Sequence, residues 1–141
     1  MDSHFERAAM TLLIPVSWGE LFDKVTILEI KAARVTDKAK LKNIRKELQL
    51  LAAIAAQARQ QNETVARSLE EVTGQLRRVN KTLWDIEDEI RDCEREKNFG
   101  PRFIELARAV YKTNDQRAAL KLEINKILGS ELIEEKSYRD Y

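Results

Sequence analysis

The sequence predicts an all-α fold, an antiparallel bundle of about four helices with a long central helical hairpin, in one domain spanning residues 1–141. The composition favours helices, because 43% of the residues are hydrophobic, 35% are charged, and only four are glycine and two are proline. From Leu41 to Cys93 the apolar residues recur at alternating spacings of three and four, which is typical of helices that bury one stripe against another helix. The polar stretch from Gln57 to Arg67 indicates that two helices share this stripe.

An N-terminal arm, residues 1–16, precedes the first predicted helix. Ser17 and Glu20 match a capping box, which predicts that this helix begins near Ser17 and runs to about Val35. Its apolar side chains point in nearly every direction around the helix axis. Because such a helix must be covered on most sides, we expect it to lie at the centre of the bundle.

The second and third predicted helices carry the apolar stripe. Asp37 is suited to cap a helix that runs to about Gln60, and Ser68-Leu69-Glu70-Glu71 matches the capping box of the next one. We expect the two to form the long hairpin, because folding the chain back near residue 65 brings together three pairs of opposite charge: Lys38 with Asp92, Lys42 with Asp88 and Arg45 with Asp85. An antiparallel homodimer of straight helices makes the same contacts, so this pattern does not separate a hairpin from a swapped dimer.

The last predicted helix begins at Gly100-Pro101, because proline is tolerated at the first helical position. It runs to Leu128, and Gly129 is suited to end it. A polar C-terminal tail, residues 130–141, follows, and we expect it to be loosely held.

The residues that most often carry chemistry are scarce in this chain. Because it contains one histidine, His4, and one cysteine, Cys93, both histidine-based acid–base chemistry and a zinc site are disfavoured. Cys93 lies on the apolar stripe, where we expect a buried thiol. The four glycines are isolated, so no phosphate-binding loop is indicated. We expect neither a metal nor a cofactor.

Polar residues on otherwise apolar helix faces are the remaining candidates for a site. The candidate buried polar cluster consists of Glu29 on the first helix, Asn80 and Glu87 on the third, and Asn114 and Arg117 on the last. Because a buried charge is costly unless it is paired, we expect Arg117 to meet Glu29 or Glu87. The secondary candidates are Asp23, Lys24, Lys31, Trp84 and Arg91.

Three interpretations of this cluster differ in their chemistry. We favour a structural ion pair that sets the helix register, because structural networks also bury charges. In the second, Glu29 and Glu87 help hold Mg²⁺ for a phosphate-bearing substrate, as in all-α nucleotide pyrophosphohydrolases, although the paired Glu-x-x-Glu pattern of those enzymes is not reproduced. In the third, Arg117 and Lys24 bind an organic carboxylate, as in small helical chorismate mutases. Glu87 is also placed for an intrahelical pair with Arg91.

Most of the chain resembles a family of short, uncharacterised bacterial proteins, a domain of unknown function. The resemblance is carried by Ile14 to Lys31, with its S-x-G-E-L-x-D-K-x-T-I-L-E-I-K pattern, and by three further segments: Leu83 to Arg91, Phe103 to Arg108 and Tyr111 to Lys121. It implies a bacterial origin and a loop near residue 60, where relatives vary in length. It implies no catalytic residues.

These observations lead us to expect a non-enzymatic binding or assembly protein, a homodimer or a partner of another protein through its helix faces. The alternative is a small all-α enzyme that acts on an anionic metabolite through Glu29, Glu87 and Arg117. With 25 Lys and Arg against 24 Asp and Glu, no excess of positive charge favours nucleic acid. No segment has the length of a membrane span or of a signal peptide core, so we expect a cytoplasmic protein.

Overall fold

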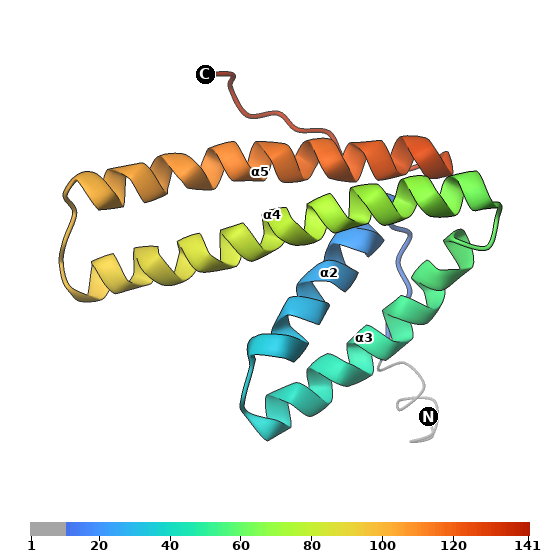
Figure 1. The fold of residues 1–141 in the computed structure, drawn as a ribbon, viewed down its shortest axis with the longest axis horizontal. Helices are drawn as coiled ribbons and strands as arrows, with labels where there is room; N and C mark the ends of the chain where they lie inside the picture. Colours follow the sequence, from blue (N-terminus) through green and yellow to red (C-terminus); the bar gives the residue numbers. More distant parts are fainter. Residues whose placement is uncertain (1–10) are drawn as a thin grey trace, which may run out of the picture.

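The computed structural model describes residues 11–141, and this part of the chain is all-α, with no strand. Its four helices are α2 (Trp18–Arg34), α3 (Lys38–Ala58), α4 (Glu63–Arg95) and α5 (Pro101–Leu128). Helices α4 and α5 form a long antiparallel pair, and α2 and α3 form a shorter pair that meets it at an angle (Figure 1). The predicted fold class is therefore confirmed.

Local signals set most of the helix ends. Ser17 Oγ accepts a hydrogen bond from the backbone N–H of Glu20 at 3.2 Å, so α2 begins as predicted, although the Glu20 side chain bonds elsewhere. Asp37 caps α3 in the same way. Pro101 is the first residue of α5, and Gly129 ends that helix in the left-handed conformation with φ of 63°, which confirms both predicted bounds.

The start of α4 differs from the prediction. The helix begins at Glu63, because Asn62 adopts an extended conformation and its Oδ1 accepts a hydrogen bond from Val65 N–H at 2.8 Å. Asparagine caps a helix as well as serine does, and it comes first in the chain. Ser68, predicted as a cap, lies inside α4. The predicted break near residue 60 is confirmed.

The pairing of the long helices also differs from the prediction, because α4 pairs with α5 and not with α3. Helix α3 diverges from α4 after the turn that joins them, and α2 contacts both (Figure 1). Within residues 11–141, none of the three predicted ion pairs between α3 and α4 forms. The apolar stripe of α4 packs on α2 and α5.

The predicted central position of α2 is confirmed. Phe22 and Thr26 are fully buried, and the main core consists of α2 side chains surrounded by those of the other three helices. A second, smaller core lies in the part of the α4–α5 pair that extends beyond α2, residues 85–112, which we call the distal hairpin. Its buried side chains are Ile86, Cys93 and Leu106, so the predicted burial of Cys93 is confirmed.

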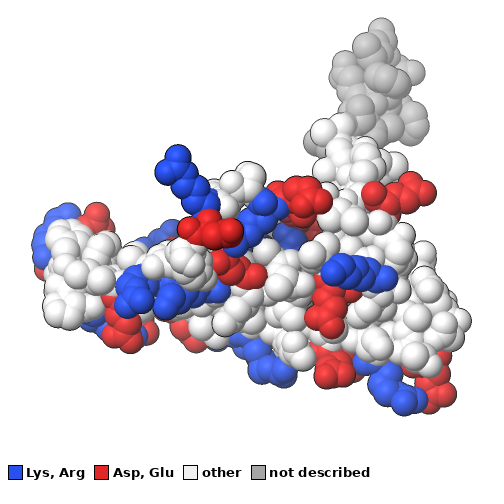
Figure 2. Space-filling model, turned by 90° about the horizontal axis from the view of Figure 1, so that it is seen from above, with Lys and Arg blue, Asp and Glu red and all other residues white. Residues whose placement is uncertain are grey.

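The C-terminal tail runs back along α5, and its residues 131–141 are all exposed. Lys136 pairs with Asp115, and the rings of Tyr111 and Tyr141 meet edge to face with centroids 5.1 Å apart. The face of the molecule that carries α5 and the tail shows positive and negative side chains interspersed with uncharged surface, without a patch of one sign (Figure 2).

Candidate functional site

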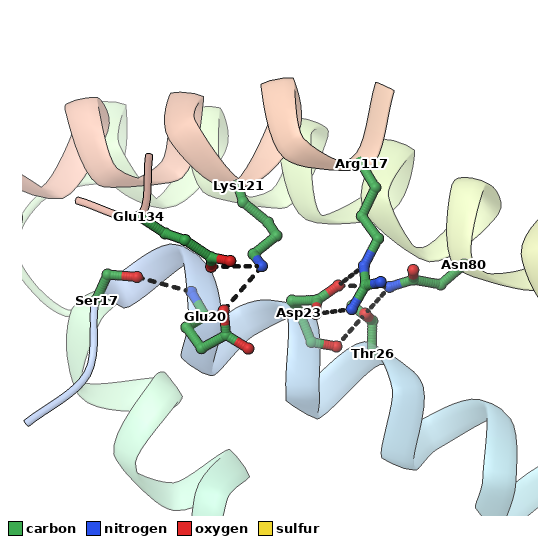
Figure 3. A network of polar contacts seen from close by, with 8 residues as sticks. All are labelled: Ser17, Glu20, Asp23, Thr26, Asn80, Arg117, Lys121 and Glu134. Atoms are coloured by element: carbon green, nitrogen blue, oxygen red, sulfur yellow. Dashed lines mark hydrogen bonds and ion pairs between the residues drawn. The ribbon is translucent and has the colours of Figure 1, made fainter. Parts of the chain in front are cut away.

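A buried ion pair lies where α2, α4 and α5 meet. The Asp23 side chain on α2 is only 2% exposed, and Arg117 on α5 binds it with two hydrogen bonds, Nε to Oδ1 at 2.9 Å and Nη2 to Oδ2 at 2.5 Å (Figure 3). This two-point geometry is the strongest that a carboxylate and a guanidinium can form. The pair joins residues 94 positions apart in the sequence.

Two neutral side chains complete the network around Asp23. Asn80 Nδ2, from α4, donates to Asp23 Oδ1 at 3.0 Å and to Thr26 Oγ1 at 2.9 Å, and Thr26 Oγ1 donates to the backbone carbonyl of Asp23 at 2.7 Å. The Asp23 carboxylate thus accepts three hydrogen bonds, which offsets the cost of removing its charge from water. We call Asp23, Thr26, Asn80 and Arg117 the junction network.

The helical positions of these residues explain why they meet. Asp23, Thr26 and Ile30 follow one another at spacings of three and four, and all three are buried on the same side of α2. Arg117 lies one turn after the buried Thr113 on α5. Each of the three helices therefore presents a polar side chain to the others, Asp23 and Thr26 from α2, Asn80 from α4 and Arg117 from α5.

A second set of contacts lies one turn toward the N-terminus of α2. Lys121 Nζ lies 2.8 Å from a Glu20 carboxylate oxygen and 3.1 Å from one of Glu134, which belongs to the tail (Figure 3). Gly19 N–H donates to Asn125 Oδ1 at 2.7 Å. A Cβ atom on Gly19 would lie 2.3 Å from the backbone oxygen of Lys121, so only glycine permits this approach of α2 to α5.

Burial and hydrogen bonds act in opposite directions on the pKa values of the cations at this junction. The bonds to Asp23 raise the pKa of Arg117, although its partial burial lowers it. Burial also lowers the pKa of Lys121, but the hydrogen bonds to Glu20 and Glu134 outweigh that effect and raise it overall. The pKa of Glu134 is lowered by the neighbouring Glu20 carboxyl group and by its hydrogen bond from Lys121. The cations at this junction therefore remain charged at neutral pH.

The expected partner of Arg117 was wrong. Arg117 binds Asp23, a secondary candidate, and neither Glu29 nor Glu87. Glu29 accepts a hydrogen bond from Arg77 Nε on α4 at 2.8 Å, because its position on α2 faces α4 and not α5. Glu87 pairs with Arg91 on the same helix, as predicted.

The remaining secondary candidates lie outside the junction network. Lys24 is exposed and pairs with Glu47 on α3 at 2.9 Å. The guanidinium of Arg34 lies over the ring of Trp84, 5.9 Å from its centroid. Lys31 is partly buried in the last turn of α2 and makes no ion pair within residues 11–141.

An open groove of about 410 Å³ adjoins the junction network, between α2, α4 and α5. It brings together six of the ten predicted site residues, Asn80, Trp84, Glu87, Arg91, Asn114 and Arg117, over a floor that includes Ile27 and Ile30. Glu29 does not line it. Asn114 and Arg117 also line a larger cavity, of about 670 Å³, between α5 and the tail.

The chemistry available at the junction is that of fixed charges. The two carboxylate oxygens of Asp23 already bind the guanidinium of Arg117, so the pair holds three helices in register. Among residues 11–141, no three His, Cys, Asp or Glu side chains lie where together they could hold a metal ion. In the same part of the chain, no helix is both long enough and apolar enough to span a membrane. His4 lies outside the described residues.

Sequence reasoning did not identify Thr26, Lys121 or Asn125 as members of this site. The signal for Thr26 was present, because a helix that is apolar on nearly every side must bury its polar residues too. Lys121 and Asn125 gave no such signal, since a polar residue beside a core face on α5 is as compatible with solvent as with a partner helix.

Comparison with known proteins finds no matching family model, no matching curated protein and no matching solved structure.

Proposed function

We propose that this protein is a non-enzymatic assembly protein that binds another protein chain through the faces of α3 and of the distal hairpin. The observation that carries the proposal is that these two parts of the molecule are packed on one side only. The proposal agrees with the role of the junction network, which is better suited to fix the relative placement of the helices than to perform a reaction.

The distal hairpin has little core of its own. It buries only Ile86, Cys93 and Leu106, whereas apolar side chains on it remain exposed: Phe99 by 51%, Ile104 by 56% and Tyr111 by 43%. Two antiparallel helices can cover only one side of each other, so a third surface is needed to bury the rest. A partner helix would provide that surface.

Helix α3 also buries few of its side chains and leaves apolar ones exposed. Of its 21 residues only Ala55 and Ala58 are buried, and among the described helices its main contacts are with α2. Leu50 is 59% exposed and Ile54 is 40% exposed. Because clustered exposed apolar side chains are typical of interaction surfaces, α3 is the second half of the proposed interface.

The alternative of a small enzyme is less well supported by the geometry. It required Glu29, Glu87 and Arg117 to converge on one ligand, but Glu29 is bound to Arg77 outside the groove. The charge of Arg117 is offset by Asp23, so this guanidinium has little attraction left for an anionic metabolite.

The mass of the purified protein in solution tests the proposal. We expect light scattering coupled to size-exclusion chromatography to report a species of at least twice the 16.4 kDa chain mass. Ile54→Glu and Ile104→Glu should each shift the protein toward the monomer, because a carboxylate replaces an apolar contact.

Ile133→Glu is the matched control, since Ile133 is 48% exposed but lies in the tail. It should leave the mass unchanged, and circular dichroism should report the same helix content for all three variants. If the wild-type protein stayed monomeric over a roughly hundredfold range of concentration, self-assembly would be contradicted. The partner would then have to be a different protein chain.

A further inference from the structure

We infer that the partner at the α3 half of this interface is a second copy of the same chain, and that the two copies exchange their N-terminal arms. Each arm covers the exposed apolar face of the other copy's α3. We call this face, which is centred on Leu50 and Ile54, the α3 patch. The inference rests on the proposed function, and it names both the partner and the segment that makes the contact.

The described end of the arm is strongly apolar and strongly exposed. Leu12 is 82% exposed, Leu13 94% and Ile14 71%, and Val16, next to the cap of α2, is 48% exposed. Residues 12–16 form neither helix nor strand, and the segment stands out from the body of the molecule (Figure 2). Clustered exposed apolar side chains are typical of interaction sites, so this segment is suited to dock on another surface.

The direction of the arm is set where it joins α2. Ser17 is extended, with φ of −73° and ψ of 156°, because its side chain caps the helix. Pro15 fixes its own φ and keeps Ile14 out of the helical conformation. The arm therefore leaves α2 as an extended segment, and its first three apolar side chains do not pack on the α3 of their own chain.

The α3 patch lies at the end of the molecule from which the arm emerges. Helices α2 and α3 are antiparallel neighbours, so the start of α2 and the end of α3 share one end of the pair (Figure 1). Leu50 lies eight residues before Ala58, the last residue of α3, which is about 12 Å along the helix. Residues 12–16, when extended, span about 17 Å. An arm that crosses over at this end from a second copy is therefore long enough to cover the patch.

The α3 patch forms a continuous face. Leu50, Ala53, Ile54 and Gln57 follow one another at spacings of three and four, so they lie on one side of α3, and all four are exposed. The side-chain amide of Gln57 can both donate to and accept from the backbone of an extended segment, whose polar groups need partners when they leave water.

The apolar area of the two elements matches what a stable dimer needs. At about 100 Å² for each fully exposed aliphatic side chain, the arm carries roughly 300 Å² of exposed apolar surface and the α3 patch about 100 Å² more. A stable interface buries about 800 Å² on each partner, of which somewhat more than half is apolar. The α3 patch alone falls far short of this area, whereas an arm and a patch from each copy supply most of it.

A second copy fits the arm better than a lipid surface does. Residues 1–16 contain one arginine, Arg7, and two acidic residues, Asp2 and Glu6, so they lack the basic cluster with which interfacial segments bind anionic lipid. One chain carries both the arm and the α3 patch. A twofold axis therefore makes both contacts at once, since each copy gives an arm and receives one.

Removing apolar side chains from the arm tests the inference. The arm variant carries Leu12→Ser and Leu13→Ser. Because both side chains are exposed within one chain, the variant should keep the helix content of the wild type, while sedimentation analysis should show the dissociation constant of the dimer raised at least tenfold. The matched control carries Leu132→Ser and Ile133→Ser, which lie in the tail at 47% and 48% exposure, and should leave the dimer intact.

The results separate this inference from the proposed function. A wild-type dimer that the arm variant leaves unchanged would overturn only the exchange of arms. A wild-type monomer would overturn self-assembly, and with it the exchange. If that monomer sedimented with vesicles of phosphatidylserine and phosphatidylcholine and the arm variant did not, the arm would be a lipid anchor instead.

Disulfide formation between two different chains tests where the arm lies. A chain with Leu13→Cys is mixed with a tagged chain carrying Leu50→Cys and oxidised gently, and Cys93 is left in place because it is buried. A disulfide requires the two Cα atoms to approach within about 7 Å. We expect at least tenfold more of the mixed disulfide than when Leu132→Cys replaces Leu50→Cys. Equal yields would overturn the placement of the arm on α3, and so would a chain carrying both substitutions that closes the disulfide within itself.

Discussion

Replacing Gly19 with alanine tests the close approach of α2 to α5 on which the junction network depends. The new Cβ atom would lie 2.3 Å from the backbone oxygen of Lys121 and 2.9 Å from its carbonyl carbon, so the contact can be relieved only by moving one helix backbone. The same shift would weaken the 2.7 Å hydrogen bond from Gly19 N–H to Asn125 Oδ1.

The expected magnitude follows from these two effects. Overpacking of this kind costs roughly 1–3 kcal/mol, and the weakened hydrogen bond costs about 1 kcal/mol more. Alanine regains up to about 1 kcal/mol through its better helix propensity, although less near a helix start. We therefore expect the Gly19→Ala variant to lose roughly 1–4 kcal/mol of unfolding free energy, a fall in Tm of about 3–14 °C for a domain of this size.

Gly74→Ala is the matched control, because the same substitution inside α4 meets nothing closer than the end of the Arg78 side chain at 3.7 Å. It should stabilise the protein by about 0.5–1 kcal/mol. Urea unfolding followed by circular dichroism measures both variants. If Gly19→Ala were as stable as the wild type, or if both substitutions stabilised the protein, the close packing of α2 on α5 would be refuted.

Two further predictions concern the charged contacts around the junction. Asp23→Ala should lower the unfolding free energy by about 3–5 kcal/mol, because it leaves the half-buried guanidinium of Arg117 without its carboxylate. Glu29→Ala breaks a more exposed ion pair and should lower it by less than about 1 kcal/mol. Equal losses of unfolding free energy in urea would contradict the burial of the Asp23–Arg117 pair. The tail should stay docked above the ordinary pKa of a glutamate and be released as the pH falls through the lowered pKa of Glu134, since protonation removes its bond to Lys121. Carboxypeptidase trimming followed by mass spectrometry would detect the release, and a trimming rate that does not change with pH in that range would count against this contact.

Helix bounds were the most predictable part of this protein, because their signals are local. Pro101 and Gly129 act through their own backbone preferences, and Asp37 acts on N–H groups two and three residues away. The start of α4 was predicted wrongly, because Asn62 and Ser68 are both suited to cap a helix and only Asn62 does so.

Partners between helices were less predictable, because they depend on how each helix is rotated and on which helix lies beside it. Arg117 was expected among the buried polar residues and is there, but the expected partners were Glu29 and Glu87, whereas Asp23 was only a secondary candidate. Only the placement of α2 between the other helices brings Asp23 to Arg117 and turns Glu29 toward Arg77.

The sequence by itself thus determined the fold class, the four helices, the central place of α2 and some of the polar positions from which a site is built, among them Asn80 and Arg117, because periodicity and capping act within about one turn of the chain. Tertiary structure alone decided that α4 pairs with α5, that α3 diverges, and that opposite charges once expected to meet within one chain are left facing outward. The physical reason is that apolar burial is not directional: several pairings cover the same stripe, and the choice among them follows from the sum of contacts over all four helices.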